Sequence, residues 1–134
     1  MENKEKIGNQ EKAAVEKTLN KYFNSLNESD VKSAVGSYTS DGVFIAAGAP
    51  TAIGIEQLNP AYEYLFKAIQ ISVNVTIDEV IIKDDIAFAR THSQATTLIR
   101  ATGENIPGEN REFFLLRKEQ GEWKIARYLF NQPK

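Results

Sequence analysis

The chain has 134 residues, with 16 basic and 18 acidic side chains and a formal net charge of −2. A chain of this length is expected to form one domain and to bury about two-thirds of its unfolded surface, enough for a core without disulfides or metal. The near balance of charge argues against a nucleic-acid partner, because phosphate binding needs a concentrated basic face.

The cysteine and histidine counts limit the possible chemistry. The chain has no cysteine and one histidine, which excludes disulfides, thiolate nucleophiles, cysteine-bound metal centres and a histidine-rich metal site within one chain. We therefore expect no metal and no other cofactor. The charged start of the chain is not followed by an apolar run, and no stretch is long enough to span a membrane. These features predict a cytoplasmic protein without a membrane partner.

The first half of the chain is predicted to be mainly helical. Residues 1–10 are rich in Asn, Gln, Lys and Glu and are expected to be a flexible lead-in to a single domain over residues 11–134. Apolar residues then recur at three- and four-residue steps, which predicts a helix from Glu11 to about Asn27. Ser29 or Asp30 can cap a second, shorter helix. A turn at 39–42, a short strand at 43–46 and a third helix at 55–68, kinked or started late by Pro60, are expected to follow.

The second half is predicted to be β-structure. Strands are expected at residues 73–77, 86–101, 111–118 and 123–130, with turns at 83–85 and 119–122 and a polar loop at 103–108. Helices followed by consecutive strands are typical of α+β proteins. We predict a curved antiparallel sheet of four to five strands wrapped by about three helices, a cone that encloses an internal pocket.

The long strand at 86–101 carries the polar side chains with the clearest functional potential. Its alternation places Phe88, Arg90, His92 and Gln94 on one face, and a nearly unbroken row of small residues on the other. The small face suits close packing against another sheet, such as that of a second subunit. Arg90 either forms an ion pair with a carboxylate such as Glu112 or binds an anionic ligand. His92 is either a hydrogen-bonded structural histidine or a general acid or base.

Several segments resemble a known family. The sequences KYFNSLNESD at 21–30, YTSDGVF at 38–44, GIE at 54–56 and GEWKIARY at 121–128 are similar to the SnoaL-like branch of the nuclear transport factor 2-like superfamily. The resemblance implies a cone-shaped, cystatin-like α+β fold with an internal pocket, and a homodimer formed through the outer face of the sheet. It also implies that the strand face with Arg90 and His92 lines the pocket.

The same resemblance allows a comparison with ketosteroid isomerase, an enzyme of this superfamily. Tyr22 matches its oxyanion-hole tyrosine. The general-base aspartate is expected at the position of Ala46, and the protonated aspartate near Phe114, and both residues are apolar here. Because acid–base catalysis contributes about 100- to 10,000-fold, we do not expect steroid isomerisation.

Two hypotheses for the function remain once steroid isomerisation is set aside. The first is binding of a small, partly apolar molecule in the internal pocket, without a complete catalytic set. The second is a lyase, cyclase or hydrolase in which His92 is the base, Tyr22 stabilises an oxyanion and Arg90 orients an anionic group. The other aromatic and polar residues expected to contact the ligand are Tyr38, Phe88, Gln94, Phe114, Tyr128 and Phe130.

Overall fold

Three helices and one six-stranded sheet make up residues 4–133, the part of the chain that the computed structural model describes. The helices are α1 (Lys4–Glu28), α2 (Val31–Gly36) and α3 (Ile55–Ala68). The strands are β1 (Tyr38–Ile45), β2 (Ala52–Ile53), β3 (Ile69–Lys83), β4 (Ile86–Ile99), β5 (Asn105–Glu119) and β6 (Glu122–Asn131). The α+β class expected from the sequence is confirmed.

The first helix is longer than the sequence predicts. It begins at Lys4, inside the segment expected to be a lead-in, because lysine, glutamate and glutamine have high helix propensity. Residues 1–3 lie outside the described part of the chain. The chain leaves α1 through Ser29, whose φ of 54° lies in the left-handed region, and α2 then starts with Asp30 as its cap. The Asp30 carboxylate accepts a hydrogen bond from the Ser33 backbone N–H at 3.1 Å.

The sheet is open and mixed, with the strand order β2-β1-β6-β5-β4-β3. The prediction of an antiparallel sheet of four to five strands needs correction, because β1 runs parallel to β6 and a two-residue β2 pairs with β1. The expected turn at 39–42 lies inside β1, where a bulge interrupts the pairing between Tyr38 and Val43. At this bulge, a Cβ on Gly42 would lie 2.7 Å from the Tyr38 ring, so glycine is needed for the close approach.

The β4–β5 hairpin extends beyond the end of β6. The sequence predicts a loop at 103–108 because this segment contains Pro107, yet β5 starts at Asn105 and Pro107 pairs with Thr96. Strand β6 ends opposite Arg111, so the first residues of β5 pair with β4 alone. Proline is tolerated on such an unpaired edge, where its missing N–H costs no ladder hydrogen bond.

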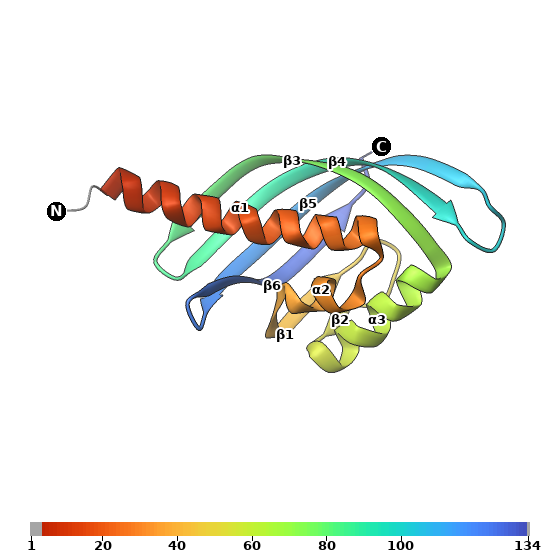
Figure 1. Cartoon of the computed structure of the whole chain (residues 1–134), viewed down its shortest axis with the longest axis horizontal. Coiled ribbons are helices and arrows are strands. Elements are labelled where there is room, and N and C mark those ends of the chain that lie inside the picture. The colour runs from red at the N-terminus through yellow and green to blue at the C-terminus, as the bar shows by residue number, and fades with distance from the viewer. Residues whose placement is uncertain (1–3, 134) are drawn as a thin grey trace.

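The core lies between α1, α3 and one face of the curved sheet. Figure 1 shows α1 running across this face, with α2 and α3 packed together at one end. The buried residues of this core cluster include Leu19 and Tyr22 from α1, Leu58 and Tyr62 from α3, and Phe114 from β5. We call the face of the sheet that contributes to this cluster the inner face, and the opposite one the outer face.

The two faces of strand β4 are reversed relative to the prediction, so that the small residues are buried and the long polar residues are exposed. Ala87, Ala89, Thr91 and Ser93 are at most 2% exposed and belong to the inner face, whereas Arg90, His92 and Gln94 are exposed on the outer face. The small side chains lie inside because the bulky aromatic residues of α1 need the space above the sheet. The small side chains from Ala87 to Ser93 are therefore buried in the chain's own interior and are not available to a second subunit.

This reversal predicts how two leucine substitutions on β4 affect stability. Ala89→Leu should lower the free energy of unfolding by about 1–3 kcal/mol, because it adds methylenes to a close-packed interior. Thr96→Leu, on the exposed face, should change it by less than about 0.5 kcal/mol. Urea unfolding followed by circular dichroism measures both. A larger loss for Thr96→Leu would contradict the assignment of the faces.

Candidate functional site

A chain of three tyrosine hydroxyl groups occupies the centre of the interior. Tyr22 of α1, Tyr38 of β1 and Tyr62 of α3 are each at most 4% exposed. The Tyr22 and Tyr62 oxygens lie 2.5 Å apart, and the Tyr62 and Tyr38 oxygens 2.7 Å apart, so that the three hydroxyls form one hydrogen-bonded line. Burial raises the pKa of all three phenols above its ordinary value. They therefore stay protonated and act as hydrogen-bond donors.

Stacked aromatic rings surround this chain of hydroxyls. Phe114 of β5 and Tyr128 of β6 stack with their ring centroids 4.2 Å apart, and Tyr128 also stacks on Phe44 at 5.2 Å. Phe130, which is half-buried, lies 6.0 Å from both Phe44 and Tyr128. Tyr22, Tyr38, Phe114, Tyr128 and Phe130 are thus brought together, as the sequence predicts.

The interior also holds a carboxyl group that the sequence does not place there. Glu112 of β5 is 4% exposed and faces the small polar residues of β4. Its Oε1 accepts a hydrogen bond from the Thr91 hydroxyl at 2.7 Å, and its Oε2 accepts one from the Ser93 hydroxyl at 2.6 Å. Among the described residues, neither oxygen forms an ion pair with a basic side chain. Burial raises the pKa of Glu112, so its protonated form is favoured relative to an exposed glutamate.

The structure places Glu112 close enough to the tyrosines to act on them electrostatically. Its negative charge contributes to the raised pKa of both Tyr22 and Tyr128, in addition to burial, which is the main cause. The inner face therefore carries tyrosine hydroxyl groups that can donate hydrogen bonds and one titratable carboxyl group, and aromatic rings surround them.

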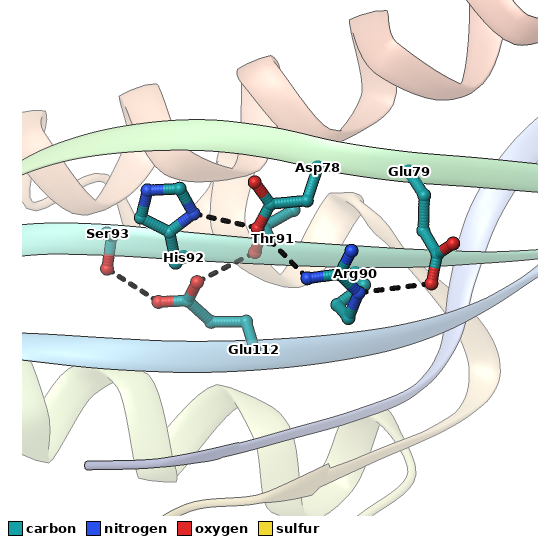
Figure 2. A network of polar contacts seen from close by, with 7 residues as sticks. All are labelled: Asp78, Glu79, Arg90, Thr91, His92, Ser93 and Glu112. Carbon is teal, nitrogen blue, oxygen red and sulfur yellow. Dashed lines mark hydrogen bonds and ion pairs between the residues drawn. The ribbon is translucent and has the colours of Figure 1, made fainter. Parts of the chain in front are cut away.

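The other predicted site residues lie on the outer face. His92 Nδ1 contacts the Asp78 carboxylate at 2.7 Å, and Arg90 contacts Asp78 at 3.5 Å and Glu79 at 3.1 Å. Figure 2 shows the two groups of contacts along β4, with Asp78 and Glu79 partnering His92 and Arg90, and Glu112 partnering Thr91 and Ser93. The expectation that Arg90 and His92 line a pocket with Tyr22 is wrong, because the sheet separates them. The partners of Arg90 are on β3, and Glu112 is not one of them.

Phe88 and Gln94 share this outer face. Phe88 is half-buried and stacks on Phe113 of β5 with a centroid distance of 5.7 Å. Gln94 is exposed and lines a shallow depression over β3, β4 and β5, together with Asn27, Ser72, Asn74, Thr96 and Glu109. Neither residue lies among the buried aromatic side chains of the interior.

Phe44, Tyr62 and Glu112 lie in this interior although the sequence did not predict them as site residues. The signal for Glu112 is its alternation with Phe114 and Leu116, which places all three on one face of β5. The resemblance implied a carboxyl near Phe114, and Glu112 lies two residues earlier on the same face. At the position implied for the general base, the chain has the half-buried Ala46.

Three depressions on the described surface lie outside this interior. They run along the polar side of α1, over the β3–β4–β5 end of the sheet, and between α1 and the β5–β6 hairpin. Of the site residues predicted from the sequence, Gln94 alone lines one of these three depressions. Within residues 4–133, no group of three or more His, Asp or Glu side chains could hold a metal ion, and no helix is long and apolar enough to cross a membrane.

The chain is similar to known proteins over most of its length. A family model described as the SnoaL-like domain matches residues 19–128. A ketosteroid isomerase-like protein from Erwinia carotovora atroseptica is 32% identical, with 91% of this chain and 95% of that chain covered and a TM-score of 0.87. No curated protein matches the chain significantly.

Two more distant solved structures share the fold. A protein of unknown function from Mycobacterium tuberculosis is 20% identical, with 98% of this chain and 77% of that chain covered and a TM-score of 0.85. A protein of unknown function with a cystatin-like fold from Nostoc punctiforme is 16% identical, with 91% and 90% covered and a TM-score of 0.73.

The buried Glu112 carboxyl predicts a pH-dependent difference between the wild type and Glu112→Gln. Because burial raises the folded-state pKa above the reference value of 4.5, this group stabilises the protein below that pH and loses its contribution as the pH rises through the folded pKa. Glu112→Gln cannot ionise, so it should be equally stable near pH 4 and increasingly more stable than the wild type toward pH 8. If folding makes Glu112 bind its proton ten times more tightly, the difference in the free energy of unfolding between low and high pH is about 1.4 kcal/mol.

Urea unfolding of both proteins across this pH range measures the difference. Glu109→Gln, an exposed position on the same strand, is the control and should show no such trend. A wild type that gains stability over Glu112→Gln as the pH rises would contradict the raised pKa.

Proposed function

The chain belongs to the SnoaL-like domain family of the nuclear transport factor 2-like superfamily, and from this premise we propose that it binds a small, partly apolar molecule on the inner face of the sheet. The molecule carries a carbonyl or phenolic oxygen, which accepts a hydrogen bond from the Tyr22 hydroxyl on the inner face that also holds Glu112. The aromatic rings around Tyr128 contact its apolar part. Cytoplasmic localisation remains an expectation.

The buried Glu112 carboxyl is the observation that carries this proposal. Burying a carboxyl group is costly, and two neutral hydroxyls offset its desolvation less well than a basic side chain does. An apolar residue at this position would give a more stable core. A perturbed carboxyl group in an aromatic interior is typical of binding and catalytic sites, where such a cost is retained for function.

Binding is favoured over turnover by the positions of the candidate catalytic groups. Ala46 stands where the resemblance implies a general base, and it has no titratable side chain. His92 and Arg90 lie on the outer face, across the sheet from Tyr22. The lyase, cyclase or hydrolase in which these three residues act on one substrate is therefore not the function we propose.

Binding of a planar phenol tests the proposal. 2-Naphthol offers an acceptor oxygen and an apolar ring system, and its fluorescence reports its surroundings. Tyr22→Phe should weaken its binding about three- to tenfold, the effect of one lost hydrogen bond, while the Tyr62–Tyr38 hydrogen bond keeps the interior in place.

Tyr64→Phe is the matched control, because Tyr64 is 77% exposed, and it should bind 2-naphthol like the wild type. Glu112→Gln should strengthen binding of the phenolate form, because the amide lacks the negative charge with which an ionised Glu112 opposes a nearby phenolate. Equal effects of Tyr22→Phe and Tyr64→Phe would refute the proposed site.

We also propose that the outer face of the sheet forms a homodimer. Exposed apolar side chains cross this face in one row, because the strand register aligns Ile45 with Leu129 and Leu129 with Phe113. These three residues are 42%, 41% and 40% exposed. The ion-paired Arg90 continues the row next to Phe113. An apolar centre with a charged rim is the usual composition of a subunit interface.

Phe113→Asp should convert the dimer to a monomer, because it places a charge at the centre of the apolar row. Ile106→Asp is the matched control, since Ile106 is 44% exposed on the same strand but has the opposite side-chain direction, and it should leave the dimer intact. Light scattering coupled to size-exclusion chromatography measures the mass. A wild type that is monomeric, or a dimer that survives Phe113→Asp, would contradict this interface.

A further inference from the structure

A groove between α1 and the β5–β6 hairpin is distinct from both faces described above. It is lined by α1 residues from Glu11 to Lys21, by Ser37 after α2, and by hairpin residues from Lys118 to Lys124. In Figure 1 the blue hairpin between β5 and β6 lies alongside α1. The hairpin turns tightly at Gln120 and Gly121, both in the left-handed region, which fixes the side chains that flank the turn.

Basic side chains dominate this groove, although the chain as a whole is slightly acidic. Four lysines line it, Lys17, Lys21, Lys118 and Lys124, against two glutamates. Lys17 and Lys21 are exposed, one helical turn apart, and form no ion pair within the described residues. Like charges at this spacing slightly destabilise a helix, and they place two ammonium groups side by side facing solvent.

The groove already binds one carboxylate, which belongs to the chain itself. Glu11 Oε1 accepts a hydrogen bond from Lys118 Nζ at 2.8 Å, and Glu11 Oε2 accepts one from the Trp123 indole N–H at 2.6 Å. The Lys118 ammonium also lies 5.8 Å from the centre of the Trp123 ring. These donors lower the pKa of Glu11, with the Lys118 hydrogen bond as the largest cause. An ammonium and an indole N–H therefore converge on an anionic group.

We propose that this groove is a binding site for a small molecule that carries a diphosphate group. Lys17 and Lys21 contact one phosphate, and the second competes with the Glu11 carboxylate for Lys118 and the Trp123 N–H. A diphosphate fits better than a single carboxylate, because it offers two anionic centres to ammonium groups on both walls of the groove. This site lies apart from the interior with Tyr22 and Glu112 and does not depend on what binds there.

Trp123 makes the binding directly observable, because it is the only tryptophan in the chain. Titration with sodium pyrophosphate at low ionic strength should give a saturable change in tryptophan emission, and isothermal titration calorimetry measures the binding whether or not the emission changes. Inorganic phosphate should bind more weakly, since it has one anionic centre. Sodium chloride at matched ionic strength should give no saturable signal.

Acidic and basic positions on the α1 wall should have opposite effects when they are substituted. Glu11→Gln should tighten pyrophosphate binding about two- to fivefold, because it removes the competing charge but keeps an acceptor for the Trp123 N–H. The double variant Lys17→Gln, Lys21→Gln should weaken it about tenfold, since each exposed ion pair contributes modestly. Lys67→Gln, an exposed lysine on α3, is the control and should bind like the wild type.

Three results would overturn the proposal. The first is that calorimetry detects no binding of pyrophosphate to the wild type. The second is that sodium chloride at matched ionic strength gives the same response as pyrophosphate. The third is that Lys67→Gln loses as much affinity as the double variant. Both lysines of the double variant are exposed and glutamine is a good helix former, so the variant is expected to fold. Its circular dichroism spectrum checks this directly.

Discussion

Because successive side chains of a strand point to opposite faces, the packing of α1 against the sheet decides the position of every side chain on β4. The helix brings bulky rings such as Tyr22 to the sheet, and only the row with Ala87 and Ala89 leaves space for them. The long polar side chains of β4 must then point outward. The same choice brings Glu112 inside, opposite Thr91 and Ser93, since it pairs directly with Thr91 in the sheet.

The interior combines features that favour stability with one that opposes it. Stacked and edge-to-face rings, together with the linked hydroxyls of Tyr22, Tyr62 and Tyr38, pack between the helices and the sheet. Glu112 is satisfied by hydrogen bonds, and no basic side chain within residues 4–133 forms an ion pair with it. Its charge is costly in this setting, and the cost grows as the carboxyl ionises. A group of this kind stabilises the fold less as the pH rises through its folded-state pKa, and the proposed ligand site on the inner face would explain its presence.

Three surfaces with different chemistry result from this arrangement. The inner face presents phenols and Glu112 among aromatic rings, the outer face has an apolar row beside ion-paired Arg90 and His92, and the groove along α1 is lined by lysines. The sheet separates the first two, and the hairpin between β5 and β6 forms one wall of the third. The proposed ligand site, subunit interface and anion site therefore use different residues.

The sequence alone determined the α+β class, the order of the helices and long strands, and which residues of β4 share a face. It also predicted that Tyr22, Tyr38, Phe114, Tyr128 and Phe130 face a common ligand site, and the structure places these five residues together in the interior. It did not determine which face of β4 is inside. Alternation is symmetric with respect to the two faces, and the decision came from the bulk of the α1 side chains packed on the sheet. The tertiary structure also decided the partners of Arg90 and His92, and the burial of Glu112, because these depend on the register between β3, β4 and β5, which pairs residues far apart in the chain.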